Sequence, residues 1–373
     1  MQKTYHIINT LYTGIRNRYL GILISTCLLV ALILLSSNIK LEPIDLNNYM
    51  KGILILIKGG NPYENIEFFA PPWFALIFGW MLILPHNLRS ILWLLGSVIS
   101  IFALAAIIIQ WFGKTLKPGV KIFFIIAATI MPASFFCYIT GQISPIIALT
   151  ALCMGYMVSM NKRINWLLAF FVLVITLKPH IVFLLLFLCV FTLLRQSNWE
   201  TLLWISAALF LSGLISYLLL QNWFIHLIMA WIRGSYKGGL PGLVAEKYVS
   251  LRDFGVPEWI FLVILISVIW IWWKTGFNEK VISLALPAGL IIIPYSRSYD
   301  FVVLIPAVLY LLTSPKYLDY VMFGVAFTAL LLLPLTQLSI LTPVIILLVL
   351  LIKMRCKEIG TQHNNKSNRV GLF

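Results

Sequence analysis

The sequence predicts an all-α polytopic membrane protein, and three observations lead to this fold class. Hydrophobic residues make up 61% of the 373-residue chain, and charged residues only 10%. Uncharged runs such as residues 20–39 are long enough to cross a hydrocarbon core of about 30 Å as a helix. Lys and Arg concentrate in short loops and at the C-terminal end, as is typical of cytoplasmic loops. A soluble domain of this size would not be so uniformly apolar.

The apolar runs and the basic loops together predict about twelve crossings, with both termini in the cytoplasm. The predicted spans cover residues 19–39, 88–112, 122–139, 143–160, 166–177, 181–194, 201–220, 259–273, 281–294, 301–312, 317–334 and 340–352. Pro132 is expected to kink its span. The proline-bounded segment 70–85 is short for a crossing, and counting it as one would put the basic loops outside. We therefore expect this segment to be re-entrant or only partly inserted.

Residues 1–352 then form a single transmembrane domain, followed by a basic, disordered cytoplasmic tail over residues 353–373. The net charge of +15 comes from 27 Lys and Arg against 12 Asp and Glu. Membrane topology and anionic lipid headgroups account for this excess, so no nucleic-acid partner is expected. The five cysteines have neither metal-site nor redox spacing, so neither a metal nor another cofactor is expected.

The first outer loop, residues 40–70, is unusually acidic for this chain. It holds four of the twelve acidic residues, which are Glu42, Asp45, Glu64 and Glu67. Wound as a helix, its first part gathers apolar side chains on one side and polar ones on the other. The apolar set is Leu46, Met50, Ile53, Leu54 and Ile57. This pattern predicts a helix lying in the interface plane, and the aromatic start of the long outer loop, residues 221–258, suits the same layer.

The predicted topology brings polar residues from distant parts of the chain to the outer boundary of the membrane. Ionisable residues at membrane depth are costly and usually functional. The set is Asp45, Tyr49, Asn61, Gln142, Lys178, His180, Arg297 and Asp300. Structural roles are the alternative: Asp45 and Gln142 could cap helices, and Lys178 could extend toward the headgroups. Arg297 and Asp300 could form a local salt bridge at a turn.

Several of these residues belong to a series of short motifs. Asp45 is followed four residues later by Tyr49, then by the run Gly-Gly-Asn61-Pro-Tyr63 and by Pro71-Pro72. Further along come Gly141-Gln142, Lys178-Pro179, and Pro294-Tyr295-Ser296 followed by Arg297 to Asp300. In this order and spacing, the series resembles the polyprenol-phosphate-dependent glycosyltransferases of the GT-C fold, and most of all the glycosyltransferase 87 (DUF2029) family. The chain departs from the family pattern at Leu46 and Ala70, where aromatic residues are more common.

The resemblance implies an inverting membrane glycosyltransferase on the outer face of the cytoplasmic membrane. It would move one sugar, such as mannose, from a polyprenyl monophosphate to a lipid or glycan acceptor. Asp45 would be the general base, and the donor phosphate would be held by Lys178, His180 and Arg297. Sugar or acceptor contacts would come from Tyr49, Asn61, Tyr63, Gln142 and Asp300, with Arg233 and Arg252 as secondary phosphate contacts. No Asp-x-Asp pair occurs, so a metal-bridged diphosphate is not indicated.

Two other functions fit parts of the sequence. A lipid-linked polysaccharide polymerase or ligase would act on diphosphate carriers and use a large outer loop with arginines, and residues 221–258 form such a loop. A transporter or flippase would carry polar groups near the bilayer midplane. The interiors of the predicted spans hold almost no charge, which favours the transferase.

Overall fold

The structure is a computed structural model that describes residues 43–64, 68–113, 116–162, 164–236, 250–293, 296–313, 317–335 and 338–370. All regular elements in these ranges are helices, which confirms the all-α prediction. The predicted first span, residues 19–39, lies outside the described ranges.

The first described element, α3 (Ile44–Ile57), is the helix predicted to lie in the interface plane. Its buried residues are Leu46, Met50, Gly52, Ile53 and Leu56. Two members of the predicted apolar set, Leu54 and Ile57, are not covered by the protein and are 42% and 61% exposed. Gly52 lies on this buried face, directly against Phe68. A Cβ added at Gly52 would lie only 2.2 Å from the ring of Phe68. Only glycine allows α3 to approach Phe68 this closely.

The proline-bounded segment that follows is not one continuous helix. It consists of α4 (Phe74–Phe78) and the 3-10 helix η1 (Gly79–Ile83), which have five residues each. Together they are too short to cross a hydrocarbon core of about 30 Å. This length agrees with a segment that does not cross.

The middle of the chain forms a bundle of helices. Its elements are α5 (His86–Trp111), α6 (Pro118–Ile130), α7 (Pro132–Thr140), α8 (Ser144–Ser159), α9 (Asn165–Ile175), η2 (Pro179–Val182), α10 (Phe183–Arg195), α11 (Trp199–Leu219) and α12 (Trp223–Tyr236). The predicted kink at Pro132 is confirmed as a 42° bend between α6 and α7. The long loop predicted over residues 221–258 contains a helix, α12, whose first residue Trp223 packs edge-on against Trp73.

The C-terminal part completes the bundle. Its elements are η4 (Leu251–Phe254), α13 (Glu258–Thr275), α14 (Glu279–Ile292), η5 (Ser298–Leu304), α15 (Ile305–Tyr310), α16 (Tyr317–Leu332), η6 (Leu333–Leu335) and α17 (Leu341–Val370). Every residue of α14 from Val281 to Ile291 is buried. A helix that is apolar all round belongs in a core, and α14 contacts α10, α13, α15 and α17. Its C-terminal end leads directly to the segment that carries Arg297 and Asp300.

Four helices of the described part are long and apolar enough to cross a membrane: α5, α11, α13 and Leu318–Leu335. The bent pair α6 and α7 makes a fifth if it counts as one span. Other apolar helices are shorter, such as α8 with 16 residues and α9 with 11. Twelve crossings therefore stay a prediction.

The outer surface of the bundle supports a membrane setting. The spanning windows of α11 and α13 are only 17% buried inside the protein. Leu218, Phe210 and Trp259 are 75%, 70% and 63% exposed. Contiguous apolar surfaces of this kind are rare on soluble monomers and normal on helices that face lipid.

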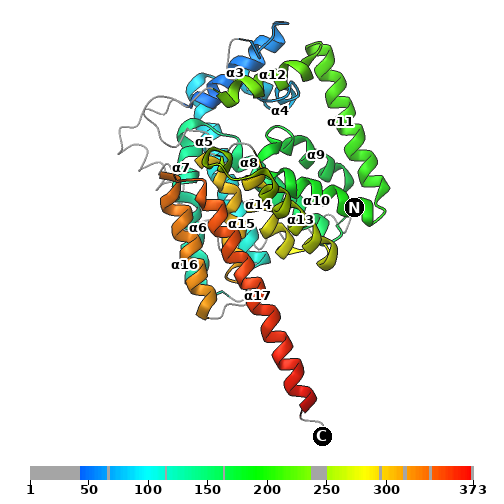
Figure 1. Ribbon diagram of the computed structural model, residues 1–373. Coiled ribbons are helices and arrows are strands. Elements are labelled where there is room, and N and C mark those ends of the chain that lie inside the picture. The colour runs from blue at the N-terminus through cyan, green and yellow to red at the C-terminus, as the bar shows by residue number, and fades with distance from the viewer. Residues whose placement is uncertain are drawn as a thin grey trace.

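The two ends of the bundle differ. Figure 1 shows α3, α4 and α12 together at one end, while the last turns of α17 project from the other. The prediction of a disordered tail from Lys353 was wrong, because α17 continues to Val370. Lys353 is 5% exposed, and its ammonium donates to the carbonyls of Leu311 and Thr313 at 2.6 and 2.9 Å. Asp319 lies 3.5 Å from the same nitrogen, so the partners needed to bury this charge are present.

Candidate functional site

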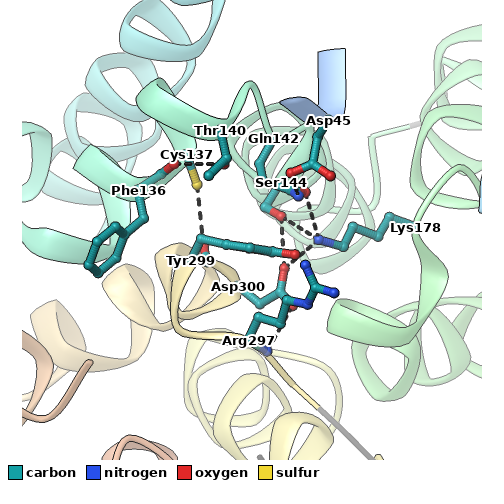
Figure 2. Close-up of polar contacts among 10 residues, drawn as sticks. All are labelled: Asp45, Phe136, Cys137, Thr140, Gln142, Ser144, Lys178, Arg297, Tyr299 and Asp300. Atoms are coloured by element: carbon teal, nitrogen blue, oxygen red, sulfur yellow. Dashed lines mark hydrogen bonds and ion pairs between the residues drawn. The ribbon is translucent and has the colours of Figure 1, made fainter. Parts of the chain in front are cut away.

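One polar cluster joins four segments that are far apart in the sequence. Asp45 comes from the start of α3, Gln142 from the turn between α7 and α8, Lys178 from the break before η2, and Asp300 from η5. Their side chains form a continuous chain of hydrogen bonds and one ion pair, shown in Figure 2. Four of the residues predicted from the sequence therefore do lie together.

Asp45 stands in the first turn of α3, where a carboxylate is favoured by the helix dipole. It is not the N-cap: that position is Pro43, and no side chain caps this helix end. The alternative of a plain helix cap was therefore wrong. The carboxylate instead accepts a hydrogen bond from Nε2 of Gln142. Asp45 is half-buried, so this bond forms at the rim of the cluster rather than in bulk solvent.

Gly141 brings Asp45 and Gln142 together. Its φ of +71° is a left-handed conformation that glycine adopts without strain, and it ends α7. A Cβ added at Gly141 would lie 2.8 Å from Pro43 and 2.9 Å from Leu46. The start of α3 thus rests directly on the turn between α7 and α8, and this contact sets the approach of Asp45 to Gln142.

Lys178 is the centre of the cluster. Pro179 lacks an N–H and opens η2, so the chain breaks after α9 and leaves Lys178 in the gap. The Lys178 ammonium donates to Asp300 Oδ1 at 2.6 Å, Ser144 Oγ at 2.9 Å and Gln142 Oε1 at 3.0 Å. Ser144 was not predicted, although it follows Gln142 by two residues and begins α8 directly before Pro145.

Asp300 is the buried anchor of the cluster, with 2% of its side chain exposed. One oxygen receives Lys178 and the hydroxyl of Ser144, which donates at 2.8 Å. The other oxygen accepts from the backbone N–H of Arg297 at 3.2 Å, which caps η5. A buried carboxylate needs such partners, because an uncompensated charge in an apolar interior is costly. Asp300 is therefore held from three directions and organises the site.

Lys178 and Arg297, the two cations of the site, both lie over the ring of Tyr299. The nitrogen of Lys178 lies 4.6 Å from the ring centroid and the guanidinium carbon of Arg297 lies 5.7 Å from it. Cation–π contacts of this length stabilise a charge that is partly removed from water. The thiol of Cys137 donates to the carbonyl of Tyr299 at 3.3 Å and joins α7 to η5. Tyr299 was also missed from the sequence, and its place beside Arg297 and Asp300 was the only available signal.

His180 and Tyr49 flank the cluster. His180 is close enough to interact electrostatically with Lys178, Arg297 and Asp300. Tyr49 packs against Phe74, with ring centroids 4.9 Å apart. Burial, followed by the negative charges of Asp45 and Asp300, raises the pKa of Tyr49 well above its ordinary value. The phenol is therefore neutral at physiological pH and available as a hydrogen-bond donor rather than as a base.

The structure gives Asn61 and Tyr63 contacts within their own loop. Asn61 donates to Glu64 at 2.8 Å and accepts from the backbone N–H of Tyr63 at 3.0 Å. The Tyr63 hydroxyl donates to the carbonyl of Ala70 at 2.8 Å, with the side chain 2% exposed. These bonds shape the turn after α3, and a substrate contact by either residue stays a prediction.

Arg252 is largely committed elsewhere. It binds both oxygens of Glu258 at 2.7 and 3.0 Å and donates to the carbonyls of Ile292 and Ile293. Four of the five N–H groups of a guanidinium are used in this way. Arg252 therefore ties η4 and α13 to the end of α14, which argues against a phosphate contact. The side chain of Arg233, and Glu42, Glu67, Pro294 and Tyr295, lie outside the described part.

The cluster could act in two ways, and its geometry favours one of them. A serine beside a lysine could form a nucleophile and base pair, as Ser144 and Lys178 do in outline. However, the Lys178 ammonium donates all of its bonds and is paired with Asp300, so it has no lone pair to accept a proton from Ser144. Asp45 is the group with acceptor capacity at the rim.

Within the described ranges, no three His, Cys, Asp or Glu side chains are grouped as metal ligands. No protein-family model matches the chain, and no curated protein matches it.

Proposed function

We propose that the chain is a membrane glycosyltransferase that moves a single sugar, such as mannose, from a polyprenyl monophosphate to a lipid or glycan acceptor. The observation that carries the proposal is the cluster at Lys178: two carboxylates, two cations and the amide of Gln142, gathered from four distant segments inside an apolar bundle. Such groups are costly to bury and usually mark a site.

The chemistry of an inverting transfer needs a base and a stabilised leaving group on opposite sides of the sugar ring. Asp45 would accept the proton of the acceptor hydroxyl, whose oxygen then bonds to the anomeric carbon. The bond from that carbon to the phosphate oxygen breaks, and the phosphate leaves with the electron pair. Arg297, with Lys178 and His180 nearby, would stabilise the charge that develops on it.

The remaining predicted residues have supporting places in this scheme. Tyr49, neutral and beside Asp45, would donate a hydrogen bond to a sugar hydroxyl. Asn61 and Tyr63 would shape the loop through which the acceptor enters. The GT-C architecture with about twelve crossings, and a site on the outer face of the cytoplasmic membrane, belong to the same proposal. The helices at the α3 and α12 end, one amphipathic and one rich in aromatic residues, support an interfacial location there.

The test is transfer by the purified full-length chain in liposomes. A polyprenyl-monophosphate sugar and a polyprenyl-diphosphate sugar are offered in parallel with membrane-extract acceptors. Transfer from the monophosphate alone is expected. Transfer from the diphosphate alone would favour a polymerase or ligase, and no transfer from either would reject the proposal.

The base is tested by Asp45→Asn, which keeps the shape and removes the acceptor charge. We expect the rate to fall by about 10²–10⁴, the usual contribution of a general base. Glu200→Gln is the matched control, because this exposed carboxylate lies in the first turn of α11 and outside the cluster. Equal rates in the two folded variants would reject Asp45 as the base.

A further inference from the structure

The ammonium of Lys178 has its hydrogen-bonding capacity filled by the protein itself. A protonated lysine has three N–H donors and no acceptor. Here the three donors reach Asp300, Ser144 and Gln142 at 2.6, 2.9 and 3.0 Å. A phosphate could bind Lys178 only by displacing one of these oxygens, and the strongest of the three bonds is a buried ion pair.

We infer that Lys178 is a positioning residue that acts on Asp45 through the amide of Gln142; this inference rests on the proposed function. An amide side chain can face either way round, and its neighbours decide which end is which. Because an ammonium only donates, Gln142 turns Oε1 toward Lys178. Its Nε2 is then left to donate to the Asp45 carboxylate. Lys178 thus sets the orientation of the amide that holds the base.

The surroundings of Gln142 make this orientation firm. Gln142 is 3% exposed, so water has little access to compete for its amide. Ser144 accepts from Lys178 and donates to Asp300 in turn, which closes a small ring of bonds around the ammonium. Side chains held by several buried bonds keep one geometry, and a misplacement of about 1 Å at a catalytic group can cost about 100-fold in rate. The donor phosphate then falls mainly to Arg297, with His180 beside it.

The inference separates two roles for Lys178 that kinetics can distinguish. In Lys178→Met, a positioning role predicts a kcat lower by about 100-fold, with a KM for the donor within about threefold of wild type. A direct phosphate contact predicts a large rise in KM instead. Lys353→Met is the matched control, because Lys353 is another buried, ion-paired lysine, held by Asp319 and by the carbonyls of Leu311 and Thr313. The control should lose stability without this loss of kcat.

A second variant keeps the buried ion pair and so tests the inference even if Lys178→Met does not fold. Gln142→Met leaves Lys178 and Asp300 paired and removes the link to Asp45. It should lose kcat as Lys178→Met does, and the double variant should be no worse than either single one. Additive losses would overturn the inference. So would weaker binding of a long-chain polyprenyl monophosphate, without sugar, by Lys178→Met alone.

A readout that needs no transfer distinguishes this inference from the proposed function. A hydrophobic carbodiimide reacts with carboxyl groups when they are protonated, and mass spectrometry measures labelling of Asp45. Loss of the fixed amide donor should speed labelling several-fold in Lys178→Met and in Gln142→Met, but not in Lys353→Met. Unchanged labelling in all three would overturn the link. If the labelling changes as expected but the wild-type protein transfers no sugar, the proposed glycosyltransferase function is rejected and the positioning of Asp45 by Lys178 stands.

Discussion

Lys178 and Asp300 form an ion pair of 2.6 Å, although 122 residues of sequence separate them. Their side chains are 13% and 2% exposed. Removing one member of a buried pair leaves an uncompensated charge, which costs about 3–5 kcal/mol. Asp300→Asn should therefore lower the free energy of unfolding by about that amount, measured as thermal unfolding in detergent.

Two variants make the test of this pair specific. Lys178→Met combined with Asp300→Leu removes both charges and should recover most of the lost stability, because apolar replacements of buried pairs are often neutral. Glu258→Gln breaks a pair whose carboxylate is 71% exposed and should change stability by less than about 1 kcal/mol. A melting temperature for Asp300→Asn equal to that of Glu258→Gln would contradict the prediction.

The contact of Gly141 with the start of α3 predicts a second effect. Gly141→Ala would meet two penalties: a positive φ and a Cβ within 3 Å of Pro43 and Leu46. Gly255→Ala is the matched control, since Gly255 has a φ of +72° and open space around it. As at Gly141, the N–H of the next residue donates to a carbonyl five residues before it, so both glycines stand in the same kind of turn. The backbone penalty of about 1–2 kcal/mol is common to both, so any further loss in Gly141→Ala reports the contact.

The same variant should also reduce transfer. Moving the start of α3 away from the turn between α7 and α8 would shift Asp45 from Gln142. We expect the rate of the folded protein to fall in Gly141→Ala and to stay near wild type in Gly255→Ala. Equal stability losses and equal rates would show that the α3 contact does not set the position of Asp45.

How far the sequence could predict this fold and site depends on the kind of signal. The 3.6-residue period, the prolines and the lack of charge were enough for the helices and for the bend at Pro132. Polar residues at the ends of the predicted helices were expected to gather at one boundary of the membrane. This pattern predicted Asp45, Gln142, Lys178 and Asp300 as site residues. These residues stand where the chain must leave a helix, and polar side chains there are unusual in so apolar a chain.

Other features had no local signal. Ser144 and Tyr299 are ordinary residues in the sequence, and their importance comes from a lysine and a thiol supplied by other helices. The exposure of Leu54 and Ile57 depends on which side of α3 Phe68 packs against, and the periodicity of the α3 sequence does not predict that side. In the sequence, Lys353 looks like the first residue of a polar tail. Its burial depends on the carbonyls of Leu311 and Thr313, which accept hydrogen bonds from its ammonium and are not adjacent to it in the sequence.

The packing of Phe68 on α3 leads to a third prediction. A Cβ at Gly52 would lie 2.2 Å from the buried ring of Phe68. Gly52→Ala should destabilise the protein by about 1–3 kcal/mol, as overpacking of a core does. Gly79→Ala, whose added Cβ would meet its nearest neighbour at 3.7 Å, should be tolerated.

A compensating change tests the cause. Phe68→Leu removes part of the ring that Gly52→Ala would strike, so the two changes together should cost less than their sum, measured by thermal unfolding. A strictly additive result would mean that α3 moves away as a whole.

The bond between Gln142 and Asp45 predicts a change in pH dependence. In Gln142→Glu a second carboxylate replaces the amide donor, and like charges at this distance favour protonation of one of them. A general base must be deprotonated to act, so the acidic limb of the pH–rate profile should move to higher pH. Lys178 faces the new carboxylate from the other side and offsets part of the effect, while Arg297, Asp300 and Tyr49 are unchanged.

We expect a displacement of about 1–3 pH units in this limb, the range over which a neighbouring charge alters a carboxyl group. The measurement is the initial rate of transfer across the acidic range, with Gln196→Glu as the matched control. Gln196 is exposed at the end of α10, so the same added charge there should leave the limb in place. If Gln142→Glu keeps the wild-type profile while still transferring sugar, a carboxylate next to Gln142 does not take the proton. Asp45 would then be a structural partner of the amide, and the base would have to be another group.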